Sequence, residues 1–154
     1  STSTETASGT AVPRASSPMR ARRHRGRRVN IGEHYCYFFD DDEFVETDRP
    51  GFRRRVITGD RLQLCIWRIA GGATGSFLHQ HDDHEQLGIV VRGGLDFRIG
   101  DDDPDDRVRL GEHEAYLAPA SVWHGDSVFV GDDEYDECWI LDVFAPPRDD
   151  LRGG

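Results

Sequence analysis

Three histidines lie at positions 79, 81 and 84, and the first two are separated by a single residue. Side chains two residues apart in an extended segment point to the same face, so His79 and His81 can reach one ion. Neutral imidazole is a common ligand of divalent metals, and further ligands must come from neighbouring strands. Short turns lead to Gln86 and to His124. The spacing therefore predicts a metal site made of His79, His81, Gln86 and His124.

Two adjacent residues, Glu85 and Gln86, compete for the third ligand position. A carboxylate is the better donor on charge, whereas Gln86 fits the strand pattern better. From Gln86 the same face continues through Gly88 and Val90, and the opposite face is an apolar strip suited to packing between sheets: Leu87, Ile89 and Val91. A one-residue slip would exchange the two faces. We favour Gln86 and keep Glu85 as the alternative.

Other interpretations of these histidines are a polar surface hairpin or an adventitious metal site without function. Neither accounts for His124, which lies far along the chain. His84, in the middle of the turn, is expected to face solvent.

The elements that would position these ligands are short strands. Apolar and β-branched runs alternate with Gly, Pro and Asp clusters from residue 34 onward, a pattern typical of strands joined by turns. The run at 62–70 is apolar on both faces and should lie between layers. The expected strands are 34–39, 52–58, 62–70, 86–92, 95–99, 107–110, 115–117, 127–130 and 138–144. The pattern predicts an all-β sandwich or barrel without long helices.

Charge is distributed unevenly along the chain. The net charge is −10, yet residues 1–30 hold seven Arg and one Glu. We expect a disordered Arg-rich tail over 1–32, one domain over 33–150 and a short end over 151–154. The acidic body argues against nucleic-acid binding by the domain, and no apolar run is long enough to cross a membrane. Three scattered cysteines are expected to be free thiols in the cytoplasm.

Two motifs in the chain resemble those of the cupin superfamily. His79, His81, Gln86 and Gly93 match the first motif in order, and the segment from Gly111 through Pro119 to His124 resembles the second. Ser121 stands where the second motif usually has glycine. The resemblance implies a jelly-roll β-barrel that binds one divalent metal ion and is often a homodimer.

The segment 142–150 resembles the closing strand of small single-domain cupins. That group includes pectin-degradation proteins, which open unsaturated uronate rings, and aromatic polyketide cyclases. The resemblance implies that Asp142, Phe144 and Arg148 line the substrate pocket. Asp142 would act as general acid or base and Arg148 would bind a carboxylate or phenolate, although structural pairing is the alternative for both. We also expect Arg92 and Trp123 to contact the small-molecule substrate.

Three functions fit this site. The first is a non-redox isomerase, lyase or cyclase in which the metal acts as a Lewis acid on an oxygenated substrate. The second is an iron-dependent dioxygenase, because imidazole suits zinc, iron and nickel alike and manganese also fits. The third is a small-molecule-binding cupin without turnover.

Overall fold

The computed structural model describes residues 29–31, 34–37, 39–75, 77–100 and 107–152. Most of the predicted N-terminal tail therefore lies outside the described residues. Within the range predicted as tail, Val29–Ile31 forms strand β1, which pairs antiparallel with β2 (His34–Cys36). This two-stranded sheet thus spans the expected boundary between tail and domain, and the boundary itself stays a prediction.

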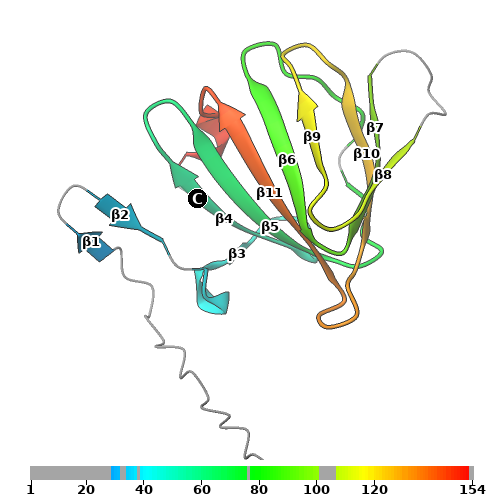
Figure 1. The fold of residues 1–154 in the computed structure, drawn as a ribbon, viewed down its shortest axis with the longest axis horizontal. Helices are drawn as coiled ribbons and strands as arrows, with labels where there is room; N and C mark the ends of the chain where they lie inside the picture. The colour runs from blue at the N-terminus through cyan, green and yellow to red at the C-terminus, as the bar shows by residue number, and fades with distance from the viewer. Residues whose placement is uncertain (1–28, 32–33, 38, 76, 101–106, 153–154) are drawn as a thin grey trace, which may run out of the picture.

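Two antiparallel sheets form the body of the domain (Figure 1). The larger sheet has the order β3 (Val45–Glu46), β4 (Phe52–Thr58), β5 (Gln63–Ala70), β11 (Glu137–Ala145), β6 (Glu85–Arg92) and β9 (Ala115–Ala118). The smaller sheet has the order β10 (His124–Val130), β7 (Gly94–Ile99) and β8 (Val108–Leu110). Two short 3-10 helices, η1 (Asp41–Glu43) and η2 (Asp149–Leu151), complete the elements.

The core lies between the two sheets, as expected for a jelly-roll barrel. Alternate residues of β11 are buried and supply one wall of the core, as the period of a strand requires. The buried cluster draws on both sheets and contains Phe52, Ile69, Val90, Leu95, Phe97, Phe129, Cys138 and Ile140. Cys65 and Cys138 are buried free thiols, which agrees with the expectation for these two cysteines.

Most strands begin and end within one residue of the predicted positions. β4 has the predicted bounds, and β5 begins one residue later than expected. β10 begins at His124, three residues earlier than expected, because the segment pairs with the end of β7 despite its glycine and aspartate. Two strands were not predicted, β1 and the two-residue β3, and neither is long enough to show a period in the sequence.

The apolar strip of β6 faces outward instead of packing between the sheets. Leu87 is 37% exposed and Val91 is 38% exposed, so our expectation for this strip is wrong for the single chain. Cross-strand pairing aligns Leu87 with Leu117 on one side and with Val143 on the other, which extends the apolar surface over three strands. The homodimer expected from the sequence stays a prediction.

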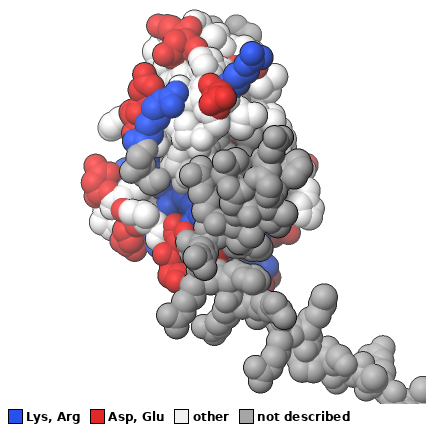
Figure 2. Space-filling view, turned by 90° about the vertical axis from the view of Figure 1, so that its left-hand side faces the viewer, with Lys and Arg blue, Asp and Glu red and all other residues white. Residues whose placement is uncertain are grey.

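Charged side chains on the described part of the surface occur in small groups of both signs. Figure 2 shows acidic and basic side chains next to each other in small groups, with uncharged atoms between the groups, on the described part of the face toward the viewer. One such group lies across β4, β5 and β11, where Glu137 accepts hydrogen bonds from Arg53 and Arg68 at 2.9 and 2.8 Å. In the part of the chain that the structure describes, no helix is long and apolar enough to span a membrane.

Candidate metal centre

Three of the four predicted ligands meet inside the barrel. One side-chain nitrogen from each of His79, His81 and His124 lies within 4.8 Å of the corresponding nitrogens of the other two. A backbone bridge brings the two ends of the site together, because the amide of His79 donates to the carbonyl of His124 and the reverse bond also forms, at 2.9 and 2.8 Å. Residues 45 positions apart in the sequence thus face each other.

The backbone sets the tautomers of two of these histidines. Nδ1 of His79 lies 2.8 Å from the carbonyl oxygen of Phe77, and Nδ1 of His124 lies 2.9 Å from that of Val122. A carbonyl oxygen only accepts, so each Nδ1 carries the proton and each Nε2 presents a lone pair. Nδ1–H bonded to a backbone carbonyl is the arrangement that orients a histidine for metal binding through Nε2.

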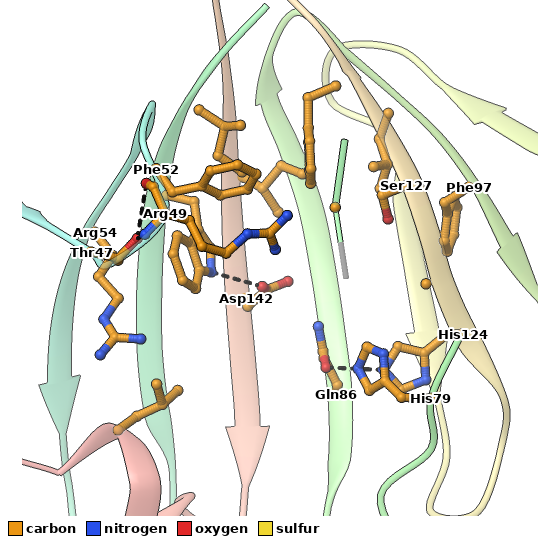
Figure 3. A pocket seen from close by; sticks show the side chains of 18 of the residues that line it. Thr47, Arg49, Phe52, Arg54, His79, Gln86, Phe97, His124, Ser127 and Asp142 are labelled. Carbon is orange, nitrogen blue, oxygen red and sulfur yellow. Dashed lines mark hydrogen bonds between the residues drawn. The ribbon is translucent and has the colours of Figure 1, made fainter. Parts of the chain in front are cut away.

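Gln86 lies beside the histidines with its oxygen toward them (Figure 3). Its Oε1 is 3.2 Å from Nε2 of His124, and its Nε2 donates to the hydroxyl of Tyr116 at 2.7 Å. Since Nε2 of His124 carries no proton, two acceptors face each other at this short distance. A shared cation would satisfy both. Glu85 is exposed and pairs with Ala145 at the rim, so the structure brings Gln86 and not Glu85 to the histidines.

The donor set fits a divalent metal ion. Nε2 of His81 is buried without a hydrogen-bond partner, which is costly unless another group binds it. Burial, followed by the nearby His84, lowers the pKa of His81 to about 4, and burial also lowers the pKa of His124. Both rings are therefore neutral near pH 7, as metal ligands must be. Three imidazoles and an amide leave the charge of a bound ion uncompensated.

A buried carboxylate lies one layer behind Gln86. Oδ1 of Asp142 accepts from the Tyr116 hydroxyl at 3.2 Å, and Oδ2 accepts from the Trp67 indole at 3.1 Å. Burial raises the pKa of Asp142 to about 6, although its hydrogen bonds with Gln86, Tyr116 and Trp67 oppose that rise. Asp142, Tyr116 and Gln86 thus form one hydrogen-bonded chain that leads to the histidines.

A cavity of about 500 Å³ opens on this chain and on the histidines. Its size is within the usual range of small-molecule sites. Three residues that we expected in the substrate pocket line it: Asp142, Phe144 and Arg148. The Arg148 guanidinium lies 4.9 Å from the Phe144 ring centre and pairs with both carboxylate oxygens of Asp150, at 3.0 and 2.7 Å. Gln63, fully buried, bonds the backbone of Arg148 and fixes this segment.

Two other residues expected to contact substrate lie outside the cavity lining. Arg92 is at the far end of β6, where its guanidinium bonds Asp132 and Glu134 at 2.9 and 2.7 Å. An irregular register between β6 and β11 near Trp139 interrupts the strand alternation before Arg92. Trp123 is 39% exposed and does not line the cavity either. The structure therefore does not bring these two side chains to the site.

Several site residues were missed by the sequence reasoning. Tyr116 and Trp67 hold Asp142, and a tyrosine or tryptophan in a strand gives no sign of such a role. His84 was expected to face solvent but is 8% exposed, with its ring centre 4.1 Å from that of His81. The left-handed backbone of Ser121 (φ 65°) explains why the second cupin motif usually has glycine there.

The comparisons agree with this geometry. The family model for the cupin domain matches residues 65–133. The chain is similar to KdgF from Halomonas sp., at 28% identity and a TM-score of 0.61, over 75% of this chain and 98% of that chain. No curated protein sequence matches the chain.

Two more distant structures share the fold. An RmlC-like cupin from Shewanella frigidimarina has 22% identity and a TM-score of 0.58, over 74% of this chain and 94% of that chain. A protein with a double-stranded β-helix domain from Klebsiella pneumoniae has 20% identity and the same TM-score, over 77% of this chain and 92% of that chain. The chain thus contains a cupin domain, matched over residues 65–133, and its described residues form one jelly-roll barrel with a three-histidine site.

Proposed function

We propose that this cupin is a metal-dependent, non-redox isomerase or lyase that acts on an oxygenated acid such as an unsaturated uronate. The observation that carries the proposal is the position of Asp142. Its carboxyl group is buried in the same cavity as the histidines and is hydrogen-bonded to the residue that orients Gln86. A proton-transfer group next to a Lewis-acid site is what such chemistry requires.

The residues of the chain have separate tasks in this proposal. His79, His81, Gln86 and His124 would hold a divalent ion, which supplies Lewis acidity toward a substrate oxygen. Asp142 takes up or delivers a proton, since a pKa of about 6 leaves both protonation states accessible near neutral pH. Arg148, stacked on Phe144, binds a substrate carboxylate. The resemblance of segment 142–150 to the cupins that open unsaturated uronate rings supports the choice of a uronate as the first substrate to test, and the similarity to KdgF agrees with it.

The proposal is tested by turnover of a 4,5-unsaturated uronate, followed as loss of the ultraviolet absorbance of its double bond. We expect turnover by the metal-loaded protein and at least about a 100-fold loss of kcat in Asp142→Asn, because the amide cannot transfer the proton. Asp133→Asn, an exposed position, is the matched control. Full activity in Asp142→Asn would exclude Asp142 as the acid or base. Iron in the protein together with substrate-dependent oxygen uptake would favour a dioxygenase.

A further inference from the structure

Two arginines that line the cavity differ from most described arginines, because no carboxylate oxygen of a described residue lies within 4.0 Å of them. Twelve arginines are described, and eight of them lie within 4.0 Å of an acidic oxygen: Arg53, Arg55, Arg68, Arg92, Arg98, Arg107, Arg148 and Arg152. The remaining four are Arg49, Arg54, Arg61 and Arg109. Arg49 and Arg54 line the cavity, whereas Arg61 and Arg109 do not. In a chain with ten more acidic than basic residues, such unpaired cations are unexpected.

Aromatic rings hold both guanidinium groups in place. The guanidinium carbon of Arg49 lies 4.3 Å from the ring centre of Phe52, and that of Arg54 lies 5.5 Å from the ring centre of Trp67. Arg49 also donates to the backbone carbonyl of Thr74 at 2.6 Å. Stacking uses the face of a guanidinium and leaves N–H groups at its edge for an acceptor. Each group is therefore oriented without a direct ion pair among the described residues, and Arg54 interacts with Asp150 only at longer range.

These arginines and the metal ligands occupy opposite sides of the cavity. Figure 3 shows Arg49 and Arg54 on the β4 side and His79, Gln86 and His124 across from them, with Asp142 in between. Arg148 is a third cationic side chain of the lining, and Asp150 pairs with it. A molecule that reaches the histidines and fills the cavity must pass Asp142 and end beside the β4 wall.

We propose that Arg49 and Arg54 form a second anion-binding subsite, which binds a carboxylate of the substrate remote from the metal ligands. The inference rests on the proposed function, because that function places the reacting end of the substrate at the histidines. With one acidic group at Arg148 and another on the β4 wall, the full site suits a substrate with several carboxylates, such as a chain of uronate units, of which a single unsaturated uronate would fill only the part next to the histidines. Guanidinium groups suit this task because they bind carboxylates through paired N–H donors.

The test uses titration calorimetry to measure the binding of two probes to the metal-loaded full chain. The probes have the same number of carbon atoms, but adipate has two carboxylates and hexanoate has one. We expect adipate to bind more tightly than hexanoate. The Arg49→Gln/Arg54→Gln variant should lose about tenfold in adipate affinity and little in hexanoate affinity. The Arg61→Gln/Arg109→Gln variant is the control, since it also removes two positive charges but from positions outside the cavity.

Equal loss of adipate affinity in both double variants would overturn the proposal, because it would show only an effect of net charge. Equal binding of adipate and hexanoate by the unmodified chain would also overturn it. The titration is repeated on His81→Ala/His124→Ala. If adipate binding in that protein still depends on Arg49 and Arg54, the subsite stands even where the metal-dependent function fails. If the protein turns over a monoacid and the arginine variants do not change that rate, the proposed function stands and the proposed subsite is excluded.

Discussion

At the scale of single residues, the centre depends on which nitrogen of each histidine carries a proton. Carbonyl oxygens of Phe77 and Val122 fix that choice for His79 and His124. The Tyr116 hydroxyl has the same function for Gln86, because accepting from the amide nitrogen turns the amide oxygen toward His124. Ligand orientation is therefore set by groups that do not themselves bind the ion.

Replacing Tyr116 by phenylalanine tests this orientation. Tyr116→Phe leaves the ring in place but removes the acceptor for Gln86 and a donor to Asp142. We expect metal affinity to fall about tenfold, as is usual when such a supporting bond is lost. Competition with a chelator measures the affinity, and Tyr135→Phe, 46% exposed, is the control. Unchanged affinity in Tyr116→Phe would mean that Gln86 needs no support from this hydroxyl.

Residue types and spacing predicted which side chains converge, but not how each is held. The pair His79 and His81 and the amide at Gln86 were identifiable because strand alternation fixes their faces. His124 was identified from the turn before it and from the resemblance to the second cupin motif. Arg92 is the last residue of β6, six residues from Gln86, so it lies at the other end of the strand from the ligands and pairs with Asp132 and Glu134. The burial of His84 depends on its packing against Phe144 and His81, which are brought there by other elements.

At the scale of elements, a glycine in β6 makes room for the bridge to Asp142. Gly88 pairs with Tyr116 of β9 on one side and with Asp142 of β11 on the other. A Cβ atom at Gly88 would lie 2.1 Å from Cε1 of the Tyr116 ring. The absence of a side chain therefore lets the tyrosine cross its neighbour strand and reach the carboxylate. Glycine inside a strand often marks such a close approach.

Gly88→Ala should accordingly displace Tyr116 and disturb both packing and the site. We expect a loss of about 1–3 kcal/mol in the free energy of unfolding, the usual cost of overpacking, measured by urea denaturation. Gly111→Ala is the matched control, because a Cβ there meets nothing closer than 3.7 Å. A Gly88→Ala protein as stable as the Gly111→Ala protein would show that the Tyr116 ring has room to move.

At the scale of the whole molecule, Glu137 joins strands that are far apart in sequence. It accepts hydrogen bonds from Arg53 of β4, Arg68 of β5 and the Trp139 indole. Burial alone would raise the pKa of Glu137, but these bonds outweigh burial and lower it below the ordinary 4.5. A carboxylate whose pKa is lowered on folding stabilises the fold fully at pH values above its unfolded-state pKa. That contribution to the free energy of unfolding is lost as the pH falls through the folded-state pKa.

Glu137→Gln should therefore cost about 1–2 kcal/mol of unfolding free energy at pH 7, because charge-assisted bonds become neutral. The difference from the unmodified protein should shrink progressively below about pH 4.5. Urea denaturation across that range measures it, and Glu46→Gln, exposed in β3, is the control. A constant difference at every pH would contradict the role assigned to the ionised carboxylate.

The barrel itself was predictable to a large extent, because its long strands have a clear period. The bounds of β4, β5, β6 and β11 lie within one residue of the predicted ones, whereas the burial of the outer face of β6 was predicted wrongly. Strand order and the two facing sheets required the resemblance to cupins. Only the part of the cavity lined by Asp142, Phe144 and Arg148 was predicted, since the full lining comes from residues between Thr47 and Leu151 whose proximity arises only on folding.

The most direct test of the account is the metal content of the protein, purified without chelators and measured by elemental analysis. We expect about one divalent ion per chain in the unmodified protein and in His113→Ala, whose histidine lies outside the cavity lining. His81→Ala/His124→Ala should contain none, because it removes two of the three converging imidazoles. Full metal content in the double variant, or none in the unmodified protein even after reconstitution, would contradict the assignment of the site.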